Sequence, residues 1–266
     1  MKFDAVQRIV GGVPFITPEH ARELYAMIVR DGMERILELG IAHGTATCTM
    51  AAALEELGRG KVTAVDLQDA TFAPSAEEQL AGCGLSEYAD VVRMKTSYTW
   101  FLHDEIRRQT VGRVCRPAYD LCIIDGPKNW TIDGCAFFLA DKLLRPGGWL
   151  IFDDYAWTYA RADAVRTATD GITHRELSVD ERTTPQIREV FELLVVPHPD
   201  YANFVVYDQQ DWAMAQKVSS GEKTYTVRYG GDFGSGWRRL AKWTRRGARG
   251  TAERLGGRRT IAPARD

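Results

Sequence analysis

The sequence predicts an α/β protein with a mostly parallel sheet of seven strands, helices on both faces of that sheet, and an antiparallel hairpin at its end. Three observations lead to this prediction. Strand and helix patterns alternate five times between residues 17 and 155. The strands are apolar at successive positions, which is typical of parallel strands that helices cover on both sides. Two further strands, joined tightly around Asp208–Asp211, then predict the hairpin.

The first half of the chain begins with a helix and continues with alternating strands and helices. Thr17 suits the cap of the first helix, and Pro18 suits its first turn. Glycines close the helix after the first strand, as is common at helix C-termini. In order, we expect a helix over residues 17–32, a strand over 35–40, a helix over 44–60, a strand over 61–67, a helix over 74–84 and a strand over 89–94.

The second half completes the alternation and then changes in character. We expect a helix over residues 98–109, a strand over 119–125, a helix over 130–144, a turn at "RPGG" over 145–148, a strand over 149–155, a helix over 184–195 and the hairpin over 203–218. Past Ser219 the regular patterns give way to glycine and arginine. We therefore expect one domain over residues 1–219, with an N-terminal helical cap segment, and a basic Gly/Arg/Trp-rich extension over residues 220–266.

Charge is distributed unevenly along the chain. The whole sequence has a net charge of -2, but residues 238–266 hold ten basic and two acidic residues, which leaves the remainder strongly acidic. A basic tail on an acidic body indicates either a separate role for the tail or a solvated arm. The acidic body argues against nucleic acid as the main partner.

Cysteine usage and hydropathy favour a cytoplasmic protein. The five cysteines form no CxxC pair and are odd in number, which is typical of reduced thiols that pack as small apolar groups. The N-terminus lacks the continuous apolar segment of a signal peptide. No run approaches the ~20 apolar residues that a membrane span requires, so we expect no contact with a membrane.

The turn after the first strand reads "ELGIAHG", from Glu38 to Gly44. Ligands of open α/β sheets bind beyond the carboxyl ends of the strands, and Gly40 and Gly44 would let the backbone approach one closely. Their G-x-x-x-G spacing differs from the G-x-G-x-x-G of dinucleotide-binding proteins. Asp66 ends the second strand, where a carboxylate can accept hydrogen bonds from both hydroxyls of a ribose. A turn that needs its glycines for itself, and a loop-capping Asp66, are the structural alternatives.

Three carboxylates follow the fourth and fifth strands. Asp125 ends the fourth strand, and Asp153 and Asp154 end the fifth. Carboxyl ends of parallel strands meet at one edge of the sheet, where these like charges repel unless a cation lies among them. Oxygen ligands and a few carboxylates suit Mg²⁺. Helix capping by one aspartate and solvation of another would be the alternative.

These motifs resemble the class I S-adenosylmethionine-dependent methyltransferases, which have a Rossmann-like fold. Their first motif runs acid-x-Gly-x-x-x-Gly, their second strand ends in a ribose-binding acid, and their seventh strand is antiparallel. The resemblance covers residues 15 to 218 and implies S-adenosylmethionine as the cofactor. It implies cofactor contacts at Glu38, Gly40, His43, Gly44, Asp66 and Ser97. His43 could equally have a local packing role, and Ser97 lies where relatives approach the adenine.

The residues after the fourth strand narrow the resemblance. Asp125, Lys128 three residues later and the pair Asp153–Asp154 resemble the metal-dependent O-methyltransferases that act on catechols and caffeoyl-CoA. The resemblance implies that the three aspartates hold Mg²⁺ or another divalent cation and that Lys128 is the base. Related sugar and macrolide O-methyltransferases share "DDY" but often place an acidic base where this chain has Pro127. Lys128 is therefore favoured as the base, and the acceptor class stays open.

We expect a hydroxylated small molecule, phenolic or sugar-bearing, as the acceptor. Trp130, Tyr155 and Trp157 lie near the predicted site and could form an aromatic wall for it, although core packing explains each equally well. Other readings are an RNA methyltransferase that uses the basic tail, a nucleotide-binding oxidoreductase, and a non-catalytic Rossmann module. Relatives are often dimers, so a homodimer is compatible with the family. The sequence identifies neither the acceptor nor the metal.

Overall fold

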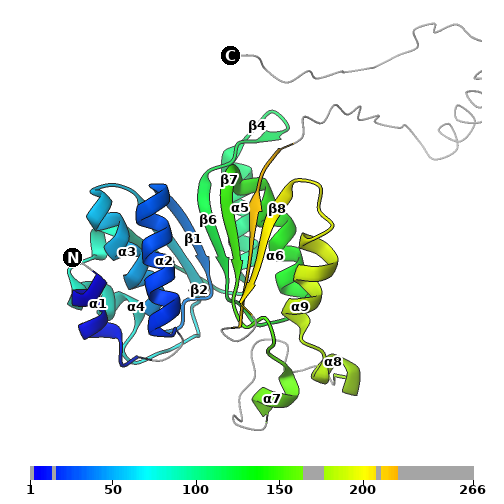
Figure 1. The fold of residues 1–266 in the computed structure, drawn as a ribbon, viewed down its shortest axis with the longest axis horizontal. Coiled ribbons are helices and arrows are strands. Elements are labelled where there is room, and N and C mark those ends of the chain that lie inside the picture. The colour runs from blue at the N-terminus through cyan, green and yellow to red at the C-terminus, as the bar shows by residue number, and fades with distance from the viewer. Residues whose placement is uncertain (1–2, 14–15, 164–176, 208–210, 221–266) are drawn as a thin grey trace, which may run out of the picture. The chain divides into compact units, whose positions relative to one another are not determined.

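The described part of the chain contains a seven-stranded sheet of the predicted kind (Figure 1). The computed structural model describes residues 3–13, 16–163, 177–207 and 211–220, so the predicted extension lies almost wholly outside it. The strand order is β3-β2-β1-β6-β7-β9-β8. Neighbouring strands from β3 to β7 are parallel, and β9 is antiparallel to both β7 and β8. The strands are β1 (Arg35–Leu39), β2 (Lys61–Leu67), β3 (Ala89–Met94), β6 (Tyr119–Ile124), β7 (Leu144–Phe152), β8 (Tyr201–Tyr207) and β9 (Trp212–Lys217).

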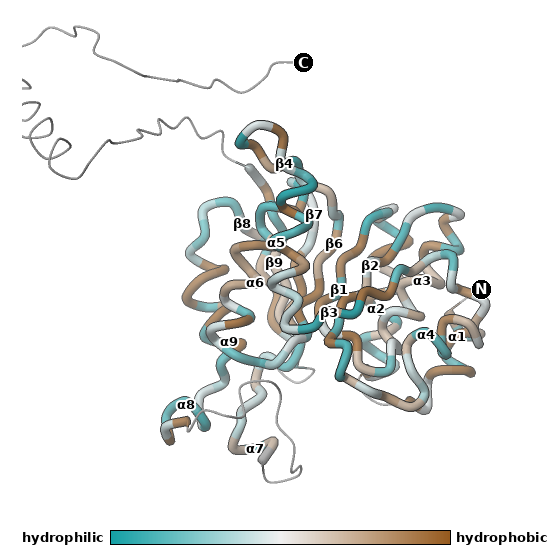
Figure 2. Tube along the Cα trace, turned by 180° about the vertical axis from the view of Figure 1, so that it is seen from behind, coloured by the Kyte–Doolittle hydropathy of each residue, from teal (hydrophilic) through white to brown (hydrophobic). Residues whose placement is uncertain are grey.

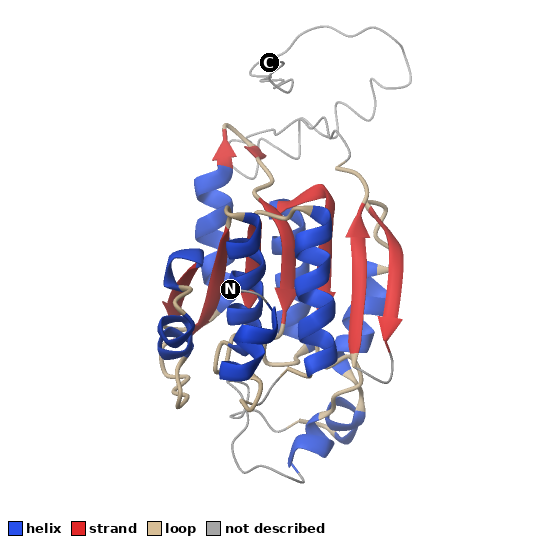
Figure 3. Ribbon diagram, turned by 60° about the vertical axis from the view of Figure 1, so that its left-hand side comes forward, coloured by secondary structure: helices blue, strands red, loops and turns tan. Residues whose placement is uncertain are grey.

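Helices cover both faces of the sheet, as Figure 3 shows. On one side lie α1 (Phe3–Val10), α2 (Pro18–Asp31), α3 (Thr45–Leu57) and α4 (Ala76–Cys83). The other side is covered by α5 (Tyr98–Gln109), α6 (Trp130–Leu143) and α9 (Gln186–Val190). Each helical layer encloses its own cluster of buried apolar side chains against the sheet. Figure 2 colours these helices partly brown and partly teal, as expected of helices with one buried face.

Local signals in the sequence explain where several helices begin and end. The Thr17 hydroxyl accepts a hydrogen bond from the backbone N–H of His20 and so caps α2. Glycines in the left-handed conformation end α2, α3 and α4. Helix α1 precedes the first helix that the sequence predicted, and its Val6 and Val10 are buried on the α2–α3 side of the sheet.

Three parts of the fold differ from the expectation. The predicted turn at residues 145–148 lies inside β7, where the pairing with β6 shifts register between Tyr119 and Leu121. A short hairpin of β4 (Thr110–Val111) and β5 (Val114–Cys115) follows α5 and was not predicted, because two-residue strands carry no periodic pattern. Between β7 and α9 the structure contains α7 (Tyr159–Asp163) and α8 (Val179–Thr183), and α9 continues as a π-helical turn over Phe191–Val195.

The carboxyl ends of the central strands are joined in one row. Three backbone hydrogen bonds continue the sheet past the paired residues. The N–H of Gly40 donates to the carbonyl oxygen of Val65 at 2.9 Å, and the N–H of Asp125 donates to that of Leu39 at 2.8 Å. The N–H of Asp153 donates to the carbonyl oxygen of Ile124 at 3.2 Å. The row brings Gly40, Asp125 and Asp153 side by side. Gly40 has φ +89°, and a Cβ atom built on it would lie 2.0 Å from the carbonyl oxygen of Asp125. The close approach of these two strand ends therefore requires glycine at position 40.

Gly40→Ala should destabilise the protein much more than Gly58→Ala does. Both glycines have positive φ, but a Cβ atom at Gly58 meets nothing within 4 Å. We expect about 1–2 kcal/mol for the left-handed backbone at either site, and about 1–3 kcal/mol more for overpacking at position 40. Urea unfolding of both variants measures the difference. Equal losses would show that the strand ends separate without cost.

Candidate active site

The row of strand ends marks a candidate site at the carboxyl edge of the sheet. Asp66 is the second-last residue of β2 and pairs with Arg93 of β3, while Asp125 and Asp153 directly follow β6 and β7. Acidic residues therefore lie along the same edge of the sheet. Helices α7 and α8 lie beyond this edge (Figure 1). Ligands of open α/β sheets bind in this position.

The glycine turn after β1 is held by a buried hydrogen bond. Glu38 is 2% exposed, and one of its carboxylate oxygens accepts from the hydroxyl of Thr47, which is fully buried in α3, at 2.6 Å. Burial raises the pKa of Glu38 to about 8; the Thr47 hydroxyl opposes this shift, and the Asp125 and Asp66 carboxylates add to it. Gly44 has φ +77°, and a Cβ there would clash with Ala76 of α4. Close packing therefore explains why glycine is required at both positions of the motif.

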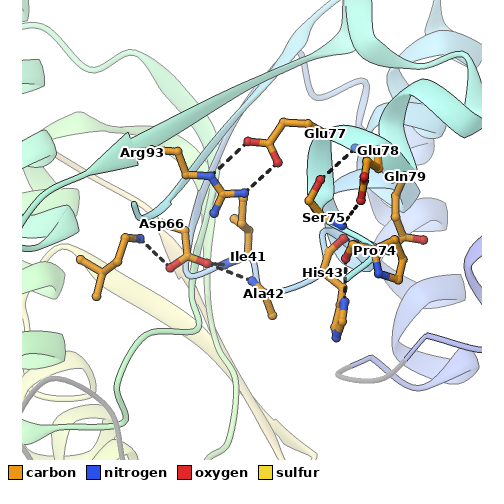
Figure 4. A network of polar contacts seen from close by, with 11 residues as sticks. Ile41, Ala42, His43, Asp66, Pro74, Ser75, Glu77, Glu78, Gln79 and Arg93 are labelled. Carbon is orange, nitrogen blue, oxygen red and sulfur yellow. Dashed lines mark hydrogen bonds and ion pairs between the residues drawn. The ribbon is translucent and has the colours of Figure 1, made fainter. Parts of the chain in front are cut away.

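Asp66 is bonded to the glycine turn itself. One carboxylate oxygen accepts from the backbone N–H groups of Ile41 and Ala42 at 3.1 and 3.0 Å, and the other accepts from Leu67 at 2.7 Å (Figure 4). Ala42 has φ 43°, an uncommon conformation for a residue other than glycine. Asp66 thus fixes the shape of the turn, and it retains acceptor capacity because two carboxylate oxygens offer about four lone pairs.

A second group of polar contacts shapes the edge near β2 and β3 (Figure 4). Arg93 forms a two-pronged pair with Glu77 of α4, at 3.1 and 2.8 Å. The side chain of Gln79 donates to the carbonyl of His43 at 2.8 Å. The His43 ring lies 2.8 Å from the carbonyl oxygen of Pro74, so it is engaged by the loop after β2. Arg93, Glu77 and Gln79 were not foreseen, because no sequence pattern connects positions on separate elements.

Ser97, the last of the predicted cofactor contacts, caps α5. Its hydroxyl accepts from the backbone N–H of Thr99 at 3.1 Å and lies 2.8 Å from the Thr99 hydroxyl. It lies beyond β3, and its bonds are those of an ordinary helix cap.

The three predicted metal ligands converge, and Lys128 lies among them. Asp125, Asp153 and Asp154 each offer a carboxylate oxygen within 4.8 Å of the others. The Lys128 ammonium lies 3.0 Å from Asp125 and 3.1 Å from Asp154. Lys128 and Asp154 both have left-handed backbones, with φ 59° and 58°. Such conformations cost of order 1–3 kcal/mol and persist where the surrounding structure fixes them.

The charges in this group perturb one another strongly. Burial raises the pKa of Asp125 to about 6, although the Lys128 ammonium opposes the shift. Burial and the two neighbouring carboxylates raise the pKa of Asp153 well above its ordinary value. Burial lowers the pKa of Lys128, but the Asp125 and Asp154 carboxylates outweigh it, so the net shift is upward. In this arrangement Lys128 is the cation that the carboxylates hold.

The donor set fits a hard divalent cation. Three carboxylates share one lysine, so the ionised group has surplus negative charge, and all its metal-facing atoms are oxygens. A second group in the described residues, Asp141, His198 and Asp200, has comparable spacing. There the buried ammonium of Lys217 already pairs with Asp141 at 3.0 Å. The first group is the better candidate for a cation site because it lies at the edge where ligands of open α/β sheets bind.

The loop that carries Lys128 is fixed by residues that sequence reasoning missed. The buried carboxylate of Asp133 accepts from the Tyr98 hydroxyl and from the backbone N–H of Asn129. The Asn129 side chain accepts from Thr131 and Ile132 and so caps α6. An asparagine four residues before an aspartate in "NWTID" is the only signal of this arrangement in the sequence.

The predicted aromatic wall divides into two kinds of residue. Tyr155 is 4% exposed, packs against Phe191, and donates its hydroxyl to Glu192 at 2.7 Å, which favours a core role. Trp130 is 40% exposed, and Trp157 is half-buried with its ring edge-on to Tyr159 at 4.7 Å. Trp130 and Trp157 are therefore the members of the wall that an acceptor can reach.

Comparison with known proteins identifies the region that contains this site. Residues 37–155 match the model of a family described as a methyltransferase domain. Residues 37–155 are a methyltransferase domain. With the sheet order, this match confirms the predicted class I S-adenosylmethionine-dependent methyltransferase. No curated protein sequence is significantly similar to the chain.

Solved structures share the fold of this methyltransferase. An O-methyltransferase from Bacillus cereus, in complex with S-adenosylhomocysteine, is 20% identical with TM-score 0.56. TomG from Streptomyces achromogenes, an O-methyltransferase of tomaymycin synthesis in complex with S-adenosylmethionine, is 18% identical with TM-score 0.54. A candidate caffeoyl-CoA O-methyltransferase from Staphylococcus aureus is 16% identical with TM-score 0.57. Each match covers 82% of this chain and 92% of the other.

No helix in the described ranges is long and apolar enough to cross a bilayer. This finding agrees with the absence of a long apolar run in the sequence. The methyltransferase domain is built from amphipathic helices around a buried sheet instead.

Glu38→Gln should change how the stability of the methyltransferase depends on pH. The pKa of Glu38 rises from 4.5 to about 8 on folding, so the folded state binds more protons and the free energy of unfolding falls as pH rises between these values. Glutamine can keep the bond from Thr47 without this penalty. Melting temperatures of the ligand-free protein at about pH 5 and about pH 9 measure the effect.

Exposed Glu87→Gln provides the control for this measurement. We expect the wild type and Glu87→Gln to lose melting temperature in parallel between about pH 5 and about pH 9, and Glu38→Gln to lose less. Three identical pH profiles would contradict the buried, protonated state of Glu38.

Proposed function

We propose that this methyltransferase transfers the methyl group of S-adenosylmethionine to a hydroxyl of a small molecule with the help of a divalent cation. The observation that carries the proposal is the convergence of Asp125, Asp153, Asp154 and Lys128 at the carboxyl edge of a methyltransferase fold. Oxygen ligands for a cation and a lysine for the hydroxyl proton suit an oxygen acceptor. The O-methyltransferases that share the fold support the same acceptor atom.

The reaction requires positioning and a nucleophilic oxygen. The sulfonium methyl is already activated, so the protein must hold the acceptor oxygen in line with it. The O–H bond of the acceptor breaks, a new C–O bond forms to the methyl carbon, and the C–S bond breaks to release S-adenosylhomocysteine. A divalent cation, when bound, would lower the pKa of the acceptor hydroxyl and orient its oxygen. The proton would go to the Lys128 amine.

The cofactor would bind across the glycine turn and the end of β2. Asp66 would accept hydrogen bonds from the ribose hydroxyls, using the carboxylate lone pairs that are not bonded to backbone N–H groups. Gly40 and Gly44 place no side chain at the two ends of the turn, and α3 begins directly after it. Glu38 lies behind the turn and supports it through Thr47. Ser97 and His43 would flank the adenine side.

Asp125, Asp153 and Asp154 would hold the cation, and Lys128 would act as the base. As a base Lys128 must be neutral, whereas the carboxylates of Asp125 and Asp154 raise its pKa. When these carboxylates ligate a cation, they no longer stabilise the Lys128 ammonium, so burial lowers the pKa of Lys128. Trp130 and Trp157 would contact the acceptor. A phenolic or sugar-bearing natural product fits such aromatic surfaces, and TomG, which shares the fold, is an O-methyltransferase involved in tomaymycin synthesis.

Cofactor binding and cation dependence test the proposal together. We expect calorimetry to show micromolar binding of S-adenosylhomocysteine and no binding of NAD. Methyl transfer to phenolic and glycosidic hydroxyls should fall by about 10²-fold or more in EDTA and return with Mg²⁺, because the cation stabilises the oxyanion. Asp153→Asn should lose turnover and keep cofactor binding.

Asp90→Asn is the matched control, since Asp90 is an exposed acid of β3 that pairs with Lys61. It should leave both binding and turnover unchanged. Full activity in EDTA would reject the cation, and NAD binding without S-adenosylhomocysteine binding would reject the cofactor.

Lys128→Met should reduce kcat by about 10²- to 10⁴-fold, the usual contribution of general base catalysis. The base form of Lys128 is the neutral amine, so the wild-type rate should increase with pH as more Lys128 loses its proton, and the variant should lose this increase. The pH profile of kcat with saturating Mg²⁺ measures both effects. Lys61→Met, which removes a lysine of an exposed ion pair, is the control. Near-normal turnover of Lys128→Met at every pH would remove Lys128 from its role.

A further inference from the structure

We propose that Gln186 and Tyr159, two buried residues of the segment after β7, are positioning residues that hold Lys128 in place for catalysis. The inference rests on the proposed function, in which Lys128 takes the proton of the acceptor. It adds two residues that no motif indicated and assigns a role to the helices α7 and α9. Both residues are more than nine-tenths buried, with 6% exposure for Gln186 and 3% for Tyr159.

Lys128 depends on support from outside its own loop. Residues 126–129 lie between β6 and α6 and have no regular structure, and the backbone of Lys128 is in the disfavoured left-handed region with φ 59°. A residue in that conformation stays there only where its neighbours are fixed. The lysine side chain reaches both Asp125 and Asp154, so small changes in the loop would move its ammonium out of the group.

One flank of the loop is fixed by the domain core. A Cβ atom on Gly126 would lie 2.1 Å from the hydroxyl oxygen of Tyr98, so this residue packs directly on the tyrosine. Tyr98 donates to Asp133, which accepts from the backbone N–H of Asn129. These contacts come from α5 and α6 and hold the loop from the side of the sheet.

The opposite flank is fixed by Gln186 and Tyr159. The side-chain oxygen of Gln186 accepts from the backbone N–H of Trp130 at 2.7 Å and from the Asn129 amide at 3.5 Å. The Tyr159 hydroxyl donates to the carbonyl oxygen of Pro127 at 3.3 Å and lies 3.4 Å from the Asn129 amide. The residues on both sides of Lys128 are therefore bonded to the segment after β7.

The same segment is tied to the predicted acceptor contacts. The Gln186 amide donates to the carbonyl of Glu181 in α8 at 2.8 Å, and the Tyr159 ring packs edge-on against Trp157. Trp130 carries the N–H group that Gln186 binds. An acceptor that packs on Trp130 and Trp157 would thus contact the direct neighbours of Gln186 and Tyr159, which fix the Lys128 loop. This connection makes the position of Lys128 sensitive to how the acceptor is bound.

A double-mutant cycle tests whether Gln186 acts through Lys128. Gln186→Leu keeps much of the side-chain volume and removes both the acceptor oxygen and the amide donor. We expect kcat to fall by about tenfold or more, from the loss of orientation, with unchanged binding of S-adenosylhomocysteine. In a Lys128→Met background the same substitution should change kcat by less than about twofold, because residues that act as a unit are not additive. Gln186→Glu, which keeps an oxygen for Trp130, should recover most of the loss.

Gln216→Leu is the matched control, since the half-buried Gln216 of β9 bonds to Asn203 of β8 and to the carbonyl of Gly147 in β7, away from the loop. It should leave kcat unchanged. Should Gln186→Leu fail to fold, Tyr159→Phe removes one hydroxyl only and takes its place in the same cycle. Equal effects of the substitution with and without Lys128 would overturn the proposal.

Reductive methylation of surface amines, followed by mass spectrometry, gives a readout that needs no enzymatic activity. Lys128 is 21% exposed at its side chain, so it reacts slowly in the wild type. Gln186→Leu should increase the labelling rate of Lys128 by about fivefold or more and leave that of Lys61 unchanged. The reason is that the substitution removes only the hydrogen bonds that fix the Lys128 loop. Unchanged labelling would overturn the positioning role. If the wild type methylates no acceptor while labelling responds as expected, the proposed function fails and the positioning of Lys128 stands.

Discussion

The backbone ladder that continues past the carboxyl ends of the central strands is the constraint on which the site depends. Hydrogen bonds from Gly40, Asp125 and Asp153 to the preceding residues of neighbouring strands align three loops at one level. The alignment is possible because position 40 has no side chain to keep β1 and β6 apart. Without that approach the carboxylates after β6 and β7 would not face the turn that carries the cofactor motif.

Once the strand ends are aligned, the site must accommodate several acids in a small space, and it does so in three ways. Asp66 is satisfied by backbone N–H groups, which carry partial positive charge and do not ionise near neutral pH. Glu38 is buried with a raised pKa, which lets it remain protonated near neutral pH. Asp125 and Asp154 share an ammonium. Only the last arrangement can exchange its positive charge for that of another cation, so it is the one suited to chemistry.

The sequence was sufficient for the fold and for the acids of the site, since both follow from local patterns. Alternating apolar strands and helices predicted the sheet, and the rule that parallel strands end at one edge predicted that Asp125, Asp153 and Asp154 converge. Patterns could not predict the register shift at β6–β7, which depends on packing of two strands together. Nor could they predict the partners of the Lys128 loop, because Tyr98 and Gln186 lie about 30 to 60 residues away in the chain and meet it only in three dimensions.

The pairing of Lys128 with two aspartates is compatible with its role as a base. An ammonium and a divalent cation compete for the same carboxylate oxygens, and the divalent ion has the larger Coulomb attraction at equal distance. The carboxylates that raise the pKa of Lys128 are two of the three that would ligate the metal. Metal binding would therefore remove the main reason for Lys128 to stay protonated, and burial would then lower its pKa. The left-handed backbone at Lys128, held by bonded neighbours on both sides, would keep the released amine at the edge where the acceptor hydroxyl arrives.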